Sequence, residues 1–239
     1  MTPRTIRAAV EHLDRGPLDR RELAALIAGD IAPGSYVNLG IGQPTAVAEY
    51  LPPEAGVVLH TENGMLGMGA QATGDAVDPD LTNAGKIPVT ETPGASYFHH
   101  ADSFAMMRGG HLDVCVLGAF QVSQRGDLAN WHTGAPDAIP AVGGAMDLAI
   151  GAKKVFVMMT LFTKDGTAKI VPECTYPLTG LRCVSRVYTD YATFEMDLTG
   201  DGHVRVLETF GVTLHALTQR MTIAQPTVTA RRTTARASV

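Results

Sequence analysis

Short segments made almost entirely of apolar residues recur along this chain and limit the folds it can adopt. Stretches with helical spacing separate four such segments, residues 36–39, 57–60, 114–117 and 155–159. Strands that are apolar without alternation are typical of a parallel sheet covered on both faces. The pattern therefore predicts an α/β fold with an open, mostly parallel sheet flanked by helices.

Local signals place the helices and a second kind of strand. Asp19, followed three residues later by Glu22, predicts a capping box at the start of a helix. Further helices are expected over residues 44–50, 102–108, 143–150 and 213–220. Segments near 183–189, 191–197 and 203–209 alternate more and predict a late antiparallel meander, whereas residues 70–100 are expected to be loop-rich.

Composition and domain organisation are those of one globular unit. The chain has 239 residues, of which 45% are hydrophobic and 18% charged. We expect a polar lead-in over residues 1–17, one domain over 18–222 and a disordered Thr/Ala/Arg-rich tail over 223–239.

Charge and cysteine usage exclude several classes of protein. A net charge of −5 argues against a nucleic-acid partner. The absence of a run of about 20 apolar residues argues against a membrane span, and the polar start argues against secretion. The three cysteines, Cys115, Cys174 and Cys183, lack metal-ligand spacing, so reduced thiols and a cytoplasmic location are expected.

One carboxylate stands out because of its position. Glu62 closely follows the apolar segment 57–60, and Asn63-Gly64 and two further glycines come next. Asn-Gly suits a tight turn, and glycine lets backbone approach a ligand closely. Ligands of open α/β sheets bind at the carboxyl ends of strands, so Glu62 is expected at such a site. In a dry site it would be a nucleophile toward an activated acyl group; the alternative is a turn residue that pairs with a base.

A dinucleotide cofactor is a competing interpretation. Residues 40–42, Gly-Ile-Gly, follow a strand and precede a helix, and the acid at Glu62 completes the outline of a dinucleotide-binding motif. Thr45 stands in place of the third glycine, and Pro44 removes a helix N–H near the expected pyrophosphate, so the match is partial.

A metal site is a weaker alternative. His99, His100 and His111 are close in sequence, but their spacing fits no recognised ligand pattern. Surface or helix-capping roles are therefore favoured, and no metal is expected.

Eight motifs follow one another through residues 18–222. In order they are YVNLGIG (36–42), ENGMLGMG (62–69), DLTNAGK (80–86), PGASYF (93–98), DSFAMMRGGH (102–111), GDLANW (126–131), GGAMDL (143–148) and PLTG (177–180). In this order they resemble the B (β) subunit of the 3-oxoacid CoA-transferases, which include the succinyl-CoA:3-oxoacid and 3-oxoadipate CoA-transferases. The resemblance implies the α/β fold that CoA-transferases share with sugar-phosphate isomerases.

The resemblance also implies a mechanism. Glu62 would attack the thioester of an acyl-CoA, and CoA thiolate would open the resulting anhydride to give a glutamyl–CoA thioester and a free acid. An incoming 3-oxoacid would reverse these steps, which gives ping-pong kinetics. Coenzyme A would thus be a substrate, and no cofactor is expected.

Supporting roles are implied residue by residue. Asn38 matches an asparagine that faces the reacting carbonyl, so its amide would donate to an oxyanion. Asn63 and Gly64 belong to the substrate-binding motif around the glutamate. The N–H groups of Gly143 and Gly144 precede a helix and would form a second anion site. Lys86 matches a lysine near bound CoA.

Departures from the family pattern leave questions open. Residues 60–61 are His-Thr where Gln-Ser is more usual, and the segment 135–142 lacks the family's lysine. The second carboxylate of an adipate-derived acid needs its own cation, for which Arg108, Lys86 or a partner residue are candidates.

The whole resemblance predicts transfer of CoA from an acyl-CoA, with succinyl-CoA as the expected donor, to 3-oxoadipate or acetoacetate. The family's A (α) subunit is the expected partner, in a heterodimer or heterotetramer. Two alternatives remain open at this point: an acyl-CoA hydrolase or lyase on the same scaffold, and a non-catalytic ligand-binding protein.

Overall fold

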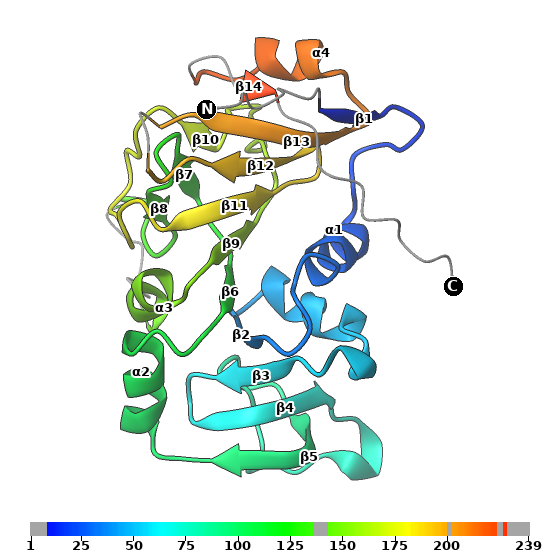
Figure 1. The fold of residues 1–239 in the computed structure, drawn as a ribbon, viewed down its shortest axis with the longest axis vertical. Helices are drawn as coiled ribbons and strands as arrows, with labels where there is room; N and C mark the ends of the chain where they lie inside the picture. Colours follow the sequence, from blue (N-terminus) through cyan, green and yellow to red (C-terminus); the bar gives the residue numbers. More distant parts are fainter. Residues whose placement is uncertain (1–8, 136–142, 200–201, 224–226, 229–239) are drawn as a thin grey trace, which may run out of the picture.

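A computed structural model describes residues 9–135, 143–199, 202–223 and 227–228 of the chain (Figure 1). Its main sheet contains β1 (Val10–His12), β2 (Tyr36–Leu39), β3 (Val58–Thr61), β4 (Met65–Gln71), β5 (Val89–Tyr97), β6 (Val114–Leu117), β9 (Val155–Met158), β11 (Val184–Tyr188), β12 (Ala192–Met196), β13 (Val204–Phe210) and β14 (Thr227–Val228). The strand order is β1-β13-β12-β11-β9-β6-β2-β3-β4-β5, and β14 pairs with β13.

The other elements lie around this sheet. The α-helices are α1 (Arg20–Ala28), α2 (His100–Arg108), α3 (Ala145–Gly151) and α4 (Leu214–Gln219), and the 3₁₀ helices are η1 (Gln43–Tyr50), η2 (Pro53–Ala55) and η3 (Gly74–Ala76). A small second sheet has the order β10 (Ile170–Val171), β7 (Gln121–Ser123), β8 (Leu128–Ala129).

The centre of the main sheet is parallel, as the apolar segments predict. Strands β11, β9, β6, β2 and β3 are parallel neighbours, and every residue of β6 and β9 is buried. Cys115 and Leu117 of β6 pack into the hydrophobic cluster under α2 and α3, whereas Val114 and Val116 pack into the cluster under α1 and η1. Figure 1 shows α1 on one side of these strands and α2 and α3 on the other. The predicted α/β sheet flanked by helices is therefore confirmed.

Antiparallel pairs lie on both sides of this parallel centre, and only one set of them was predictable. The expected meander is present as β11, β12 and β13. The expectation of loops over residues 70–100 is wrong for β5, which pairs with β4. A Cβ on Gly67 would lie 2.9 Å from Oγ1 of Thr92, and one on Gly69 would overlap Oγ1 of Thr90. These glycines let β4 lie close to β5, although glycine lowers strand propensity.

The two terminal segments contribute more to the sheet than expected. Residues 10–12 of the lead-in form β1, which is parallel to β13. In the segment expected to be disordered, Ile223 is buried and Thr227–Val228 form β14, while residues 224–226 and 229–239 lie outside the described part. Both β1 and β14 gain backbone hydrogen bonds by pairing with β13, and no local sequence pattern predicts this pairing.

Three helix starts follow from local chemistry. The capping box at α1 is confirmed, because the Asp19 side chain accepts from the N–H groups of Arg21 and Glu22. Residues 43–50 form a 3₁₀ helix, with Pro44 in its first turn. Helix α2 begins two residues before the expected position, since Nδ1 of His99 accepts from the N–H of Ala101. This is the capping role expected among the histidines.

Candidate active site

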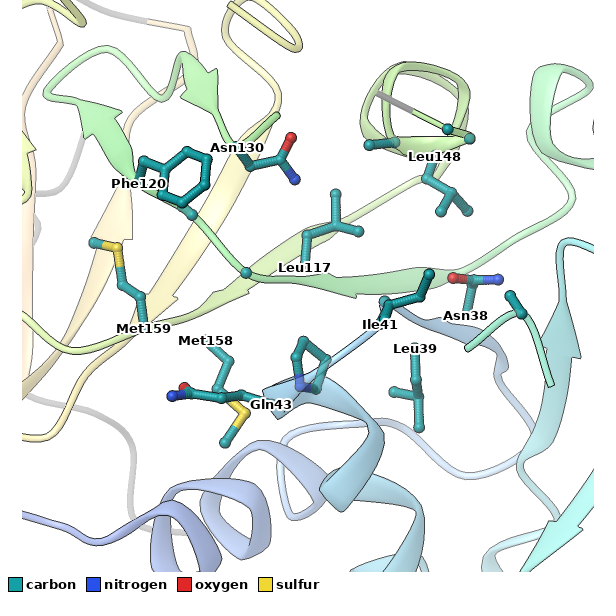
Figure 2. Close-up of a pocket in the computed structure, with 18 of the residues that line it drawn as sticks. Asn38, Leu39, Ile41, Gln43, Leu117, Phe120, Asn130, Leu148, Met158 and Met159 are labelled. Atoms are coloured by element: carbon teal, nitrogen blue, oxygen red, sulfur yellow. The ribbon is translucent and has the colours of Figure 1, made fainter. Parts of the chain in front are cut away.

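A cavity of about 370 Å³ lies beside the central strands, mainly where they end (Figure 2). Its lining combines ends of the parallel strands, the loops after them and the start of α3. The lining residues are Asn38, Leu39, Gly40, Ile41, Gln43, Pro44, Glu62, Ala84, Leu117, Gly118, Ala119, Phe120, Asn130, Gly143, Gly144, Ala145, Leu148, Met158, Met159, Thr160 and Lys169. Four of the predicted site residues therefore share one cavity: Asn38, Glu62, Gly143 and Gly144.

Glu62 contacts the backbone of Gly144 across this cavity. The Gly144 N–H donates a hydrogen bond to the half-buried Glu62 carboxylate. A Cβ on Gly144 would overlap Oε2 of Glu62 and lie 3.3 Å from Cζ of Phe104. Only glycine leaves room for the carboxylate to reach this N–H. Glu62 and Gly144, which are far apart in sequence, are thus in contact in the folded chain.

The electrostatic environment of Glu62 is mixed. Burial raises the pKa of its carboxyl, and the carboxylate of Asp147 raises it further; His100 and the hydrogen bond from Gly144 lower it. Arg108 faces Asp147, with its Nε 2.6 Å from Oδ1. Phe104 stacks on His100 and lies under the Arg108 guanidinium. One face of α2 thus presents two basic side chains beside the acidic groups.

A buried hydrogen-bond network lies behind the glutamate. Nδ2 of Asn38 is 3.1 Å from Nδ1 of His60 and 3.2 Å from the His60 carbonyl oxygen. Since an amide NH₂ only donates, Nδ1 accepts, and Nε2 carries the proton that it donates to Oγ of Ser103 at 2.9 Å. The Ser103 hydroxyl then donates to the carbonyl of Thr61 at 3.3 Å. Burial lowers the pKa of His60 to about 4, so its ring is neutral at pH 7.

This network bears on the predicted role of Asn38. Both contacts of its amide nitrogen go to His60. Donation to an oxyanion would require Asn38 to exchange one of them, so that role stays a prediction. His60 itself was noticed in the sequence only as a departure from the family pattern.

Three of the predicted site residues do not line the cavity. Asn63 donates to the carbonyl of Thr82 at 2.8 Å and so ties the turn after β3 to the loop at residue 82. Gly64 has φ +118°, and a Cβ there would overlap the Phe98 carbonyl oxygen. Lys86 is exposed and has φ +62° in the turn after Asn83. The first two shape the turn that presents Glu62, and the CoA contact of Lys86 stays a prediction.

The opposite side of the cavity contains residues that sequence reasoning missed. In Figure 2, Phe120 and Met159 lie on one side of the cavity and Asn38 on the other. Asn130 accepts at Oδ1 from the Thr179 hydroxyl, at 2.6 Å, and among the described residues its NH₂ has no hydrogen-bond partner. Lys169 lines the same cavity. The only signal in the sequence is the position of Asn130 inside the motif GDLANW.

Comparison with known proteins identifies the family. Residues 20–220 match the family described as coenzyme A transferase. This chain belongs to the coenzyme A transferase family. The B subunit of a 3-oxoadipate CoA-transferase from Pseudomonas putida is 63% identical over 183 residues, which are 77% of this chain and 85% of that protein.

Two further proteins are similar to this CoA-transferase chain. The B subunit of a succinyl-CoA:3-ketoacid coenzyme A transferase from Helicobacter pylori is 49% identical over 176 residues, 74% of this chain and 84% of that protein. The structure of an acyl-CoA transferase from Escherichia coli O157:H7 superposes with a TM-score of 0.69 at 19% identity, and covers 92% of this chain and 44% of that one. At this identity the superposition shows the shared fold.

Two features are absent from the described part of the CoA-transferase chain. None of its helices is both long enough and apolar enough to cross a membrane. Over the same residues, no group of three or more His, Cys, Asp or Glu side chains is arranged to hold a metal ion.

Proposed function

We propose that this chain is the glutamate-bearing subunit of an enzyme that transfers CoA from an acyl-CoA to a 3-oxoacid, with Glu62 as the nucleophile. The observation that carries the proposal is the contact between Glu62 and the N–H of Gly144 inside the cavity. The relatives named as 3-oxoadipate and succinyl-CoA:3-ketoacid transferases support the two classes of substrate.

The first half-reaction loads CoA onto Glu62. An oxygen of the carboxylate attacks the thioester carbonyl, the carbon–sulfur bond breaks, and CoA leaves as thiolate. The thiolate then attacks the Glu62 carbonyl carbon of the acyl–glutamyl anhydride, which releases the acid and leaves a glutamyl–CoA thioester. Glu62 must be ionised for the first attack, and the hydrogen bond from Gly144 favours that form despite the burial.

The second half-reaction returns the carboxylate. An incoming 3-oxoacid attacks the glutamyl thioester through its own carboxylate and displaces CoA thiolate, which then attacks the acyl carbonyl of the new anhydride. In each attack on the Glu62 carbon, negative charge develops on a Glu62 oxygen. The N–H of Gly144 already faces that carboxylate, so it is placed to stabilise this charge, an effect of about 3 kcal/mol at comparable sites.

The remaining cavity groups bind the substrate and keep water out. The amide NH₂ of Asn130 projects from an asparagine whose oxygen is held by Thr179, so it is available for an acyl carbonyl. Leu117, Phe120 and Met159 give the cavity apolar walls. Excluding water protects the anhydride and the thioester from hydrolysis.

The proposal also includes a partner subunit and a cellular location. Relatives named as B subunits support pairing with an A subunit, in a heterodimer or heterotetramer. Coenzyme A is the substrate that carries the acyl group, and the chain needs no further cofactor. A cytoplasmic location, where acyl-CoA substrates occur, belongs to the same proposal.

Trapping the covalent intermediate tests the proposal. The chain, co-purified with its A subunit, is incubated with succinyl-CoA, treated with borohydride or hydroxylamine, digested and analysed by mass spectrometry. We expect modification at Glu62, its loss in Glu62→Gln, and its retention in Glu54→Gln, which changes an exposed glutamate of η2. An unmodified Glu62 in an active complex would refute the mechanism. Steady CoA release without an acceptor acid would indicate a hydrolase, and full activity of the chain alone would remove the need for a partner.

A further inference from the structure

One lysine is among the residues that line the cavity. Lys169 lines the same cavity as Glu62. Lys169 is half-buried, and among the described residues its ammonium has no hydrogen-bond or ion-pair partner. The carboxylate of Asp190 raises the pKa of this ammonium, and its Oδ1 accepts from the N–H of Leu161 at 2.8 Å. Partial burial makes the charge of this ammonium less favourable than it is in water, so this position favours an anionic ligand.

The backbone holds Lys169 firmly in place. Its N–H donates to the carbonyl of Leu161 at 2.9 Å, and its carbonyl accepts from the N–H of Val122 at 3.0 Å. The next residue, Ile170, is buried and begins β10. The side chain therefore extends from a fixed point between the loop after β9 and the small sheet. Burial lowers the pKa of the ammonium, and a bound carboxylate would restore it.

Several of the residues that line this cavity are apolar. Glu62 follows β3 and Met159 follows β9, so the row of strand ends crosses three strand spacings, roughly 14 Å. Leu117, Phe120 and Met159 are among the apolar members of this lining that lie along or beyond this row of strand ends. An acyl group with a second carboxylate at its far end matches a cavity that contains a carboxylate, apolar walls and a cation.

We infer that Lys169 binds the distal carboxylate of a dicarboxylic acyl group, which makes the site selective for dicarboxylic over monocarboxylic 3-oxoacids. The inference rests on the proposed function, because it assumes that the reacting end of the same acid is activated at Glu62. Both succinyl and 3-oxoadipyl groups carry such a distal carboxylate, whereas acetoacetyl does not. One lysine would thus serve both half-reactions.

The two cations considered from the sequence are less suited to this task. Arg108 is exposed, and its guanidinium is already within 2.6 Å of Asp147. Lys86 is exposed and does not line the cavity. Only a desolvated charge gains much from binding a carboxylate, because water weakens exposed ion pairs.

The test compares two acids of equal carbon number in the complete complex. Both 3-oxoadipate and 3-oxohexanoate, which has a methyl group in place of the distal carboxylate, are assayed as acceptors with succinyl-CoA or acetyl-CoA as donor. We expect Lys169→Met to lower the kcat/KM ratio of dicarboxylate to monocarboxylate on the order of 100-fold. Lys169→Arg keeps the charge and should retain most of the preference. Lys164→Met removes an exposed lysine of the same loop and should leave the ratio unchanged.

The outcomes separate this inference from the proposed function. One outcome is that the wild-type complex forms the glutamyl–CoA adduct while Lys169→Met leaves the ratio of kcat/KM for the two acids unchanged. In that case the inference is wrong and the mechanism stands. If no adduct forms at Glu62, the mechanism itself fails. Lys169→Arg and thermal melting of each variant separate loss of selectivity from loss of fold.

Discussion

The two ends of the cavity hold their charges in opposite ways. At the β3 end, Glu62 has a hydrogen bond from Gly144 and a basic neighbour in His100. At the β10 end, Lys169 lines the cavity with its ammonium unpaired among the described residues. The described residues therefore supply partners to the reacting group and none to the far group, whose partner we infer to be the ligand.

This difference follows from what each group must do. A nucleophile has to be ionised and aimed before the substrate arrives, and fixed backbone groups accomplish this without reorganisation. A selectivity group gains most when the correct ligand supplies its missing partner, since a ligand without that group leaves the charge unpaired. Variants at the reacting end should therefore slow the chemistry, whereas a variant at the far end should change the choice of acid.

The largest expected effect is at the nucleophile. Glu62→Gln keeps the size of the side chain and removes the attacking oxygen charge, so turnover should fall roughly 10⁴-fold or more. Steady-state transfer assays of the co-purified complex measure this. The exposed control Glu54→Gln should retain wild-type rates. Residual activity near wild type in Glu62→Gln would mean that the reacting end lies elsewhere.

The reacting end was more predictable from sequence than the far end. Glu62 directly follows an apolar strand and precedes Asn-Gly, so local signals place it at a strand end. Lys169 has no such signal: it lies in a polar stretch that also contains Lys164, which is exposed. Its burial results from pairing of β10 with β7, which lies far earlier in the chain. Long-range pairing of this kind leaves little trace in local sequence.

The strands of the main sheet also differ in how well the sequence predicts them. Strands β6 and β9 are buried on both faces and therefore appear as continuous apolar runs. Strands β4 and β5 contain Gly67, Gly69 and the pair Pro93-Gly94, which lower local strand propensity. Their pairing depends on close contact across glycine, which is a tertiary property. Local patterns predicted the parallel centre and the meander, and missed this edge.

The second prediction concerns the backbone partner of the glutamate. Gly144→Ala places a methyl group where Oε2 of Glu62 lies, so the carboxylate must move away from the N–H. A displacement of this size should lower kcat roughly 100-fold. Rapid-quench measurement of adduct formation locates the loss in the chemical step. Gly16→Ala is the matched control, since a Cβ there meets nothing within 4 Å. Unchanged kcat in Gly144→Ala would show that this N–H has no role.

The third prediction concerns stability at the reacting end. His60 has a pKa of about 4 in the folded chain against 6.5 when unperturbed, so the unfolded chain binds the proton more tightly. Stability from this group is present above the unfolded pKa and is lost as pH falls through 6.5 toward 4. Between pH 7 and pH 5 the loss should be about 2 kcal/mol.

Urea denaturation at the two pH values measures this loss. His60→Gln retains an amide that can replace the ring in the network but does not titrate, so its stability should fall by about 2 kcal/mol less than that of wild type over the same interval. Equal pH dependence in both proteins would show that the histidine ring is not held neutral.

The smallest expected effect is a shift in pH profile that distinguishes the fixed charges around Glu62. Asp147 raises the pKa of Glu62, and Arg108 faces Asp147. Arg108→Gln should therefore move the acid limb of kcat/KM to higher pH, and Asp147→Asn should move it to lower pH, each by roughly a few tenths of a unit because the pair is solvent-exposed. Lys153→Gln breaks the ion pair with Asp113, which is not among the groups that shift the pKa of Glu62, and should leave the limb in place. If the Arg108 and Asp147 variants moved the limb in the same direction, the acid limb would report a group other than Glu62. The contrast between a pre-paired nucleophile and an unpaired far cation would then lose its electrostatic basis.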